Sequence, residues 1–313
     1  MAGRPVLRYH PGKGLGVFMR KFPVFGTIAR AYGFGFGHFF TNLALVWSSV
    51  ALLWAATWFM QQPYLKAFAE FDRDPHMVTQ TYPMYFLFSL VSLVLVAAQA
   101  MLLTREALGM RTGPALLQFP FRPATWRMAV AFFFYYLVLI VLYIGLFLAI
   151  LLGGGLVAAA HAGKIGGAVI AVAAVIGFLA FFYVAMRLSF FIGPVAVAER
   201  RISLIRGWEL AAGNGGRIVL VFLATLVPFI LVEATVAVAF FASVFKGFHP
   251  GMTPQESQAI GRSVAASVKH LTTGYWLLFY PLSAAVTVLM YGMLSGAAAH
   301  AYQALTREDQ PKT

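Results

Sequence analysis

Six long runs of apolar residues dominate this sequence and leave few folds open to it. A helix needs roughly 20 apolar residues to cross the hydrocarbon core of a bilayer, and each run is about that long. The runs are continuous and do not alternate with a period of two, so they predict transmembrane helices. The predicted spans are Phe39–Met60, Met84–Thr104, Met128–Leu152, Ile165–Leu188, Ile218–Phe241 and Trp276–Ala299.

The composition supports a membrane protein. The chain is 61% hydrophobic and 11% charged, whereas about 25% charged residues are usual in a soluble domain. A net charge of +13 raises the question of nucleic-acid binding, but the basic residues lie between apolar segments and not in one patch, which favours a membrane. The absence of cysteine excludes disulfides and thiolate metal sites. We expect no cleavable signal peptide, because the first apolar run begins near Phe39.

The basic residues also predict the orientation. With six spans, both ends of the chain lie on the same side as the second and fourth connections, and these segments hold 17 of the 23 lysines and arginines. The positive-inside rule therefore places both termini in the cytoplasm. The predicted location is a bacterial cytoplasmic (inner) membrane, crossed several times.

Three regions are expected: a basic cytoplasmic arm with an amphipathic segment over residues 1–38, a six-helix transmembrane domain over 39–300, and a short cytoplasmic tail over 301–313. Amphipathic segments starting near Val24, Ala115 and Ile202 are spaced about 90 residues apart, and each leads into a span. The predicted fold class is thus an all-α integral membrane protein with short interfacial helices and a threefold internal repeat. A plain succession of loops and spans gives the same rhythm, so two interpretations of the repeat stay open.

The connection Arg187–Arg217 between the fourth and fifth spans reads RLSFFIGPVAVAERRISLIRGWELAAGNGGR. It predicts a break near Gly193–Pro194, because proline lacks an amide proton. A short interfacial helix follows, with Ser203 as its N-cap and Gly213 at its end. This helix places Trp208 at the boundary between water and lipid and turns arginines towards anionic headgroups. The candidate headgroup contacts are Arg187, Arg200, Arg201, Arg206, Trp208 and Arg217.

The same connection carries, in this order, Arg187, Pro194, Glu199, Ser203, Trp208, Gly213 and Asn214. This pattern resembles a group of bacterial six-span proteins related to the membrane domain of glycerophosphodiester phosphodiesterases, including the stand-alone YciC-like proteins. The resemblance implies a helical bundle with interfacial helices and a membrane-organising role. The chain has no extramembrane region large enough for a phosphodiesterase barrel, so the hydrolytic activity is not expected to carry over.

An alternative interpretation makes this connection the coupling loop of an ABC-transporter permease, which would add an ATPase subunit as a partner. Glu209, Ala211, Gly215 and Pro228 fit the register of such a loop, although Leu210 stands where alanine is usual. The segment enters the fifth span at once, which leaves little exposed loop to dock an ATPase.

Glu233 lies within the fifth span, where an ionised carboxylate costs about 2.5 kcal/mol or more. We expect it to be protonated, paired or facing water, with Gln99 and His300 as candidate partners. Two interpretations follow: a proton- or substrate-linked site, or an interhelical hydrogen bond that fixes packing. Five tyrosines are further candidate partners: Tyr135, Tyr136, Tyr143, Tyr183 and Tyr291.

Two local patterns predict structure rather than chemistry. Thr253 followed by Pro254 and Glu256 predicts the capped start of a helix running to about Leu271 along the extracytoplasmic surface. The small-residue pairs Gly163/Gly167 and Gly292/Gly296 suit close helix contacts.

The sequence shows no constellation for catalysis. The seven histidines are scattered and none of the serines stands in a G-x-S-x-G context, so no metal, cofactor or catalytic residue is predicted. We therefore expect a non-enzymatic inner-membrane protein that organises the membrane or binds or moves a lipid-like amphiphile. The alternative is a transport permease, coupled through Glu209 to an ATPase or through Glu233 to protons. Membrane lipids and a second copy or another membrane protein are the expected partners, and nucleic acid is not.

Overall fold

The computed structural model describes residues 21–69, 76–118, 121–159, 163–245, 252–274 and 276–306. Within these ranges the regular structure is helical and no strand occurs. The elements are α1 (Val24–Gly37), α2 (Phe39–Ala69), α3 (His76–Ala107), η1 (Ala115–Leu117), α4 (Pro123–Ala159), α5 (Gly163–Ser189), α6 (Ile192–Ala198), α7 (Leu204–Leu210), α8 (Gly215–Phe245), α9 (Pro254–Gly274) and α10 (Trp276–Thr306).

Six stretches of helix are long and apolar enough to cross a membrane, which confirms the predicted six-span, all-α fold. Their most apolar parts coincide with the hydrophobic runs of the sequence. Length and apolar composition are therefore sufficient to explain why these helices can cross a membrane. The candidate spans are Phe39–Met60, Thr79–Ala107, Pro123–Gly155, Gly166–Ala198, Gly215–Thr235 and Tyr280–Thr306.

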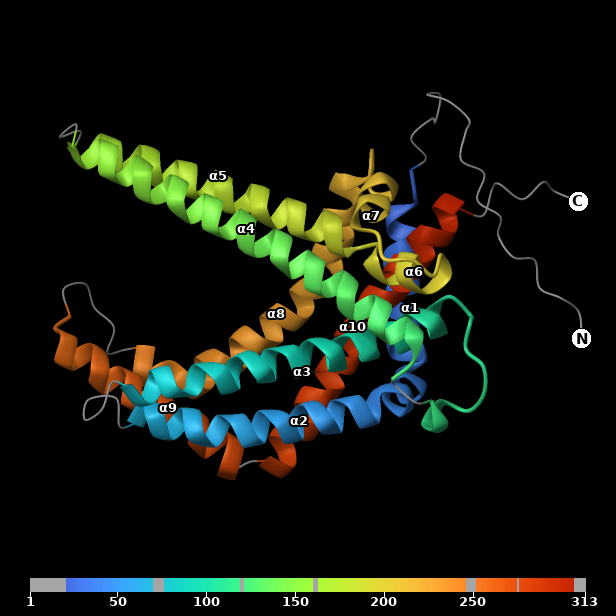
Figure 1. Cartoon of the computed structure of the whole chain (residues 1–313), viewed down its shortest axis with the longest axis horizontal. Coiled ribbons are helices and arrows are strands. Elements are labelled where there is room, and N and C mark those ends of the chain that lie inside the picture. The colour runs from blue at the N-terminus through green and yellow to red at the C-terminus, as the bar shows by residue number, and fades with distance from the viewer. Residues whose placement is uncertain are drawn as a thin grey trace, which may run out of the picture.

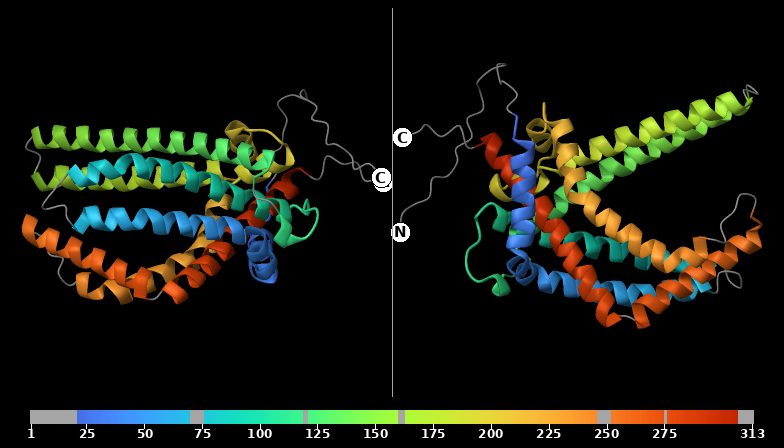
Figure 2. Two further views of the ribbon diagram at one scale, coloured as in Figure 1. Left: turned by 60° about the horizontal axis from the view of Figure 1, so that its bottom comes forward. Right: turned by 180° about the vertical axis from the view of Figure 1, so that it is seen from behind.

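The long helices form two groups that meet at one end of the molecule. The α4–α5 hairpin diverges from the group formed by α2, α3, α8, α9 and α10 (Figure 1), as the view from behind also shows (Figure 2). In the most apolar 18-residue windows of α4 and α5 no residue is buried inside the protein. Apolar surface of this kind is stable against lipid tails, so the hairpin needs no protein partner along most of its length.

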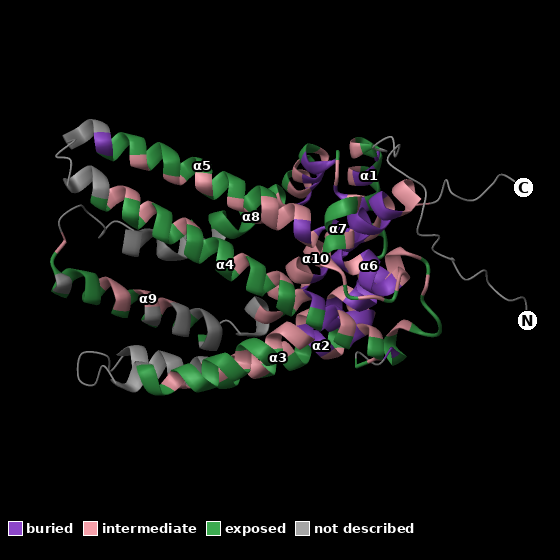
Figure 3. Cartoon of the chain, turned by 45° about the horizontal axis from the view of Figure 1, so that its top comes forward, coloured by how far each residue is buried: buried purple, intermediate pink, exposed green. Residues whose placement is uncertain are grey.

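Buried residues are concentrated at the end where the two groups meet (Figure 3). The short helix α6 lies in the middle of this core. Its residues Ile192 and Ala196 belong to a cluster with α2, α3, α4 and α10. Its residue Val195 belongs to a second cluster with α1, α8 and α10. One short apolar helix therefore ties both groups of long helices together.

A helix break before α6 lies close to the predicted position. The helix is interrupted at Phe190–Phe191, before Gly193–Pro194. Pro194 then occupies the first turn of α6, where its missing amide proton removes no intrahelical hydrogen bond. Gly193 lets α6 approach α3 closely, since a Cβ at this position would lie 2.8 Å from Thr104 Oγ1.

Helices α1 and α10 pack closely although they are far apart in the chain. A Cβ on Gly296 would lie 2.9 Å from Phe34 Cβ of α1, and one on Gly292 would lie 3.7 Å from Gly35 Cα of α1 and 3.0 Å from Asn42 Nδ2 of α2. This confirms the predicted close contact at Gly292/Gly296. Among the described residues, no atom of another segment lies within 4 Å of the corresponding position on Gly167, so the close contact predicted at Gly163/Gly167 is not seen for Gly167.

Helical packing continues on both sides of the expected region limits at residues 38 and 300, and the division into three regions stays a prediction. Helix α1, assigned by the sequence to the cytoplasmic arm, packs along α10, and α10 itself continues to Thr306. A short element precedes two long helices three times, but these elements have 14, 3 and 7 residues. In the described part of the chain, an additional helix between the long helices, α9, occurs in the third group alone. A common repeat unit therefore stays a prediction.

Helix α9 begins with the predicted capping box. The Thr253 backbone amide donates to Glu256 Oε2 at 2.7 Å, and the Glu256 amide donates to Thr253 Oγ1 at 3.3 Å. The hydrogen bonds from the backbone and the hydroxyl of Thr253 lower the pKa of Glu256. The helix packs against α2, α8 and α10, and so covers the bundle at the end opposite the main core (Figure 1).

Candidate anion-binding site

The connection between α6 and α7 contains a carboxylate that holds three partners. Glu199 follows the last residue of α6 and forms an ion pair with Arg201. Its Oε1 accepts hydrogen bonds from Arg206 Nε at 3.3 Å and from the Tyr302 hydroxyl of α10 at 3.2 Å. The Glu199 side chain is only 17% exposed, so this network fixes the connection to α7 and α10 in partly dry surroundings.

Arg206 lies between two carboxylates. In addition to Glu199, it contacts Glu209 Oε2 at 3.5 Å on the exposed side of α7. Burial lowers the pKa of Arg206, but the two carboxylates outweigh this effect and raise its pKa above the ordinary value. Arg206 therefore has intramolecular partners of its own, which the headgroup role predicted for it did not include.

Helix α7 has the features expected of an interfacial helix. Ser203 is its N-cap, with Oγ accepting from the Arg206 amide at 3.1 Å. The Arg187 guanidinium stacks 3.6 Å from the ring centroid of Trp208, a cation–π contact that links α5 to α7. Ile205 is 74% exposed, so α7 presents an apolar side chain to its surroundings at the same level. The Ser203 cap was predicted correctly; the Arg187–Trp208 contact was not foreseen.

The end of this connection anchors the chain before α1. Asn214 is buried, and its Oδ1 accepts a hydrogen bond from the Phe22 amide at 3.3 Å. Arg217 donates from Nη1 to the Phe22 carbonyl oxygen. Arg217 thus has an intramolecular partner besides the predicted lipid contact, and Asn214 joins segments 192 residues apart.

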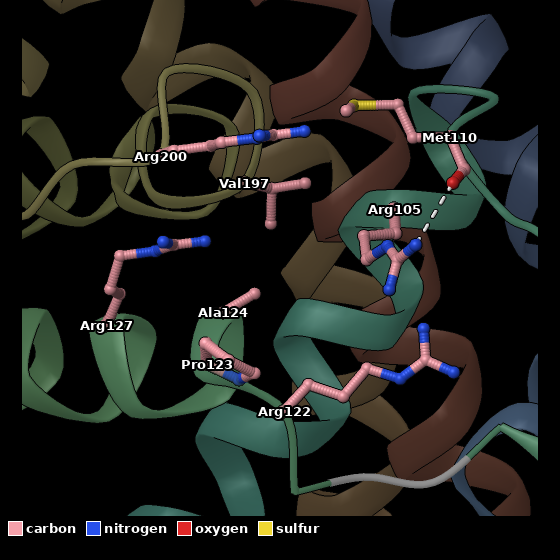
Figure 4. Close-up of a pocket in the computed structure, with 8 residues that line it drawn as sticks. All are labelled: Arg105, Met110, Arg122, Pro123, Ala124, Arg127, Val197 and Arg200. Carbon is pink, nitrogen blue, oxygen red and sulfur yellow. Dashed lines mark hydrogen bonds between the residues drawn. The ribbon is translucent and has the colours of Figure 1, made fainter.

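Four arginines surround a cavity of about 350 Å³ beside α6. Arg105 comes from the end of α3, Arg122 and Arg127 from the start of α4, and Arg200 from the turn after α6. Figure 4 shows Arg127 and Arg200 on one side of the cavity and Arg105 and Arg122 on the other. The other lining residues carry no charge: Met110, Pro123, Ala124 and Val197.

Among the residues that the structure describes, no carboxylate lines this cavity. Glu106, next to Arg105 in the chain, forms an ion pair with Arg111 at 2.9 Å, and Glu199, next to Arg200, is held by the network described above. Positive charge therefore accumulates in the cavity without a negative group among the residues that line it.

The cavity arginines retain donors for a ligand. Arg105 uses one Nη2 hydrogen bond, to the Met110 carbonyl oxygen at 3.3 Å, and the Nε of Arg127 is buried without a hydrogen-bond partner. Each guanidinium has five N–H donors and stays charged at any physiological pH. Such forks recognise phosphate and carboxylate groups through paired hydrogen bonds. An anion held by several arginines is the chemistry that this site favours.

Of the six predicted headgroup residues, only Arg200 lines this cavity. Arg105, Arg122 and Arg127 belong to the second connection between spans, and from the sequence they predict only the orientation in the membrane. A signal was present, since all three lie close to span ends in an otherwise apolar chain. This position indicates the membrane surface, but it does not indicate that the three arginines line one cavity.

The predicted intramembrane polar residues Glu233, Gln99 and His300 lie on three different helices, α8, α3 and α10. Glu233 is exposed on α8, and no hydrogen bond or ion pair joins it to another described residue. Gln99 is buried in α3 with its Nε2 unpartnered. His300 is half-buried near Gly26 of α1. Glu233 is therefore exposed on the surface of α8, and its pairing with Gln99 or His300 stays a prediction.

The fold and this site define the chain as a polytopic all-α membrane protein with a basic cavity at the ends of three of its spans. Comparison with family models, with curated proteins and with solved structures gives no significant match.

Proposed function

We propose that this protein is a non-enzymatic protein of the bacterial cytoplasmic membrane that binds an anionic amphiphile at the cytoplasmic end of its bundle. The observation that carries the proposal is the four-arginine cavity without a lining carboxylate. A negatively charged headgroup would neutralise these cations, while the acyl chains of the same molecule stay in the bilayer.

The position of the arginines along the spans supports an amphiphile. Arg105 lies two residues before the end of its span at Ala107, and Arg122 directly precedes the span that starts at Pro123. Arg200 follows the span that ends at Ala198 by two residues. Span ends lie at the depth of lipid headgroups, where anionic lipids attract arginine and lysine.

The surroundings of the cavity fit the same role. Helix α7 carries the exposed Ile205 and the Arg187–Trp208 pair beside it, and such side chains are typical of helices that lie in the interface. The excess of basic residues at this end supports a cytoplasmic location for it under the positive-inside rule. The resemblance to the membrane domain of the phosphodiesterase relatives agrees with a role in the membrane without hydrolysis.

Lipid retention tests the proposal. We expect the full chain, purified from vesicles that contain phosphatidylcholine and phosphatidylglycerol, to retain the anionic lipid preferentially in native mass spectrometry. The double variant Arg122→Gln/Arg127→Gln should lose that preference. Arg262→Gln on α9, at the other end of the bundle, is the matched control and should keep it. Equal retention of both lipids by the unmodified chain would overturn the proposal.

A further inference from the structure

We infer that the arginine cavity selects ligands with at least two negative phosphate charges over ligands with one, and that Arg200 sets this selectivity. The inference rests on the proposed function and deepens it. The ligand class is a headgroup that carries either a phosphomonoester or two phosphodiesters.

The charge of the cavity is the first reason. A single phosphodiester carries one negative charge and would leave three of the four guanidiniums uncompensated. Arg122 lies near enough to Arg105 to repel it electrostatically, and no acidic residue lines the cavity to relieve this repulsion. A ligand with two negative charges therefore reduces the repulsion between the arginines more than a ligand with one charge does.

The arginines differ in depth, which gives them different roles. Arg105, Arg122 and Arg127 are half-buried, whereas Arg200 is exposed. The three half-buried arginines come from the end of α3 and from the beginning of α4 with the residue before it, and they lie on both sides of the cavity (Figure 4). Arg200 approaches from the turn after α6, as the outermost cation. The three half-buried arginines therefore hold a first phosphate, and Arg200 is left to meet a second charge.

The backbone of Arg200 is the second reason. Among the described residues it is the one non-glycine with a positive φ, 54°. This left-handed conformation is unfavourable for a residue with a Cβ and persists only where the surroundings impose it. Here Glu199 is held by Arg206 and Tyr302 on one side of it, and Ser203 starts α7 on the other.

Glycine would satisfy that backbone at lower cost, so folding alone does not explain an arginine at this position. The turn presents the guanidinium to the cavity (Figure 4). Ligand binding by the Arg200 side chain explains why an arginine occupies this unfavourable backbone conformation. Replacement by glycine therefore separates the two contributions, because it relieves the backbone and removes only the outer cation.

The experiment compares retention of three lipids by the full chain in vesicles of phosphatidylcholine: phosphatidylglycerol with one charge, and phosphatidic acid and cardiolipin with two. We expect the unmodified chain to prefer the doubly charged lipids about tenfold, the effect of one charge-assisted hydrogen bond. Arg200→Gly and Arg200→Asn, which both tolerate the left-handed backbone, should abolish this preference by lowering retention of the doubly charged lipids about tenfold and that of phosphatidylglycerol much less. Their thermal stability in detergent should equal or exceed that of the unmodified chain.

The outcomes separate the two proposals. Equal retention of singly and doubly charged lipids overturns the inference and leaves the proposed function standing. Retention of no anionic lipid above phosphatidylcholine overturns both. Arg262→Gln serves as the charge control, and a loss of preference in this variant would overturn the assignment to Arg200. Inorganic pyrophosphate is added as a competitor; if it displaces cardiolipin completely at equal concentration, the ligand is a soluble phosphate and the headgroup assignment is overturned.

Discussion

Replacing Glu199 by glutamine tests whether the α6–α7 connection is held by charge. The substitution keeps the size of the side chain and leaves one oxygen to accept a hydrogen bond. It removes the negative charge shared by Arg201, Arg206 and Tyr302. The matched control is Glu209→Gln, which removes the other carboxylate that contacts Arg206.

The expected loss of stability follows from exposure. The Glu199 side chain is 17% exposed and its partner Arg206 is 26% exposed, so their contact is partly protected from solvent. A hydrogen bond to a charged group contributes about 1.5–3 kcal/mol. Arg201 is 39% exposed, and its share is discounted because solvent screens it. We expect Glu199→Gln to lower the free energy of unfolding by about 2 kcal/mol.

The control should lose far less. Glu209 is 58% exposed, and exposed ion pairs contribute about 0.2–1 kcal/mol. Both variants are unfolded at equilibrium in mixed micelles with increasing dodecyl sulfate, and tryptophan fluorescence follows the transition, because Trp208 lies against Arg187 in the same region. Losses that agree within about 0.5 kcal/mol would refute the reasoning that burial of Glu199 decides its contribution.

Three further changes test other parts of the fold. Gln99→Met removes a buried amide whose Nε2 has no partner, so the free energy of unfolding should rise by about 1 kcal/mol in the same micelle assay; a loss would contradict the assigned burial. Gly296→Val should cost about 1–3 kcal/mol, since α1 leaves no room for the added atoms, whereas Gly167→Val, with open space around it, should cost less than 1. The lowered pKa of Glu256 means that its bond to Thr253 stabilises the start of α9 above the ordinary pKa of 4.5 and is lost as pH falls through the lowered value. The protection of the first-turn amides against hydrogen exchange, relative to the intrinsic exchange rate at each pH, should therefore fall in acid, and Glu256→Gln should remove that pH dependence.

The spans could be predicted because the bilayer imposes a simple rule on sequence. Runs of about 20 apolar residues are hard to place elsewhere, and the six runs recur in the six candidate spans. The caps at Ser203 and Thr253 were also predictable, because a cap depends on residues only three positions away.

The site was harder to predict because it depends on distant segments. Arg105 and Arg200 are brought together only by the packing of α6 against α3 and α4, and no local pattern marks that packing. Glu233 illustrates a second limit. Its depth in the span could be read from the sequence, but the side of α8 on which it lies depends on how α8 packs in the bundle.

The packing of α1 on α10 has a consequence for biogenesis. Gly35 and Met293, which lie against each other, are 258 positions apart. At roughly 5–20 residues per second of synthesis, α1 waits about 10–50 s before its partner helix exists. During that time lipid is the available cover for the side of α1 that ends buried at Ala31. Insertion of the sixth span is thus the step that completes the core. A ribosome that stalls before α10 leaves a chain in which the other five spans are made but the contacts of α10 with the core are missing.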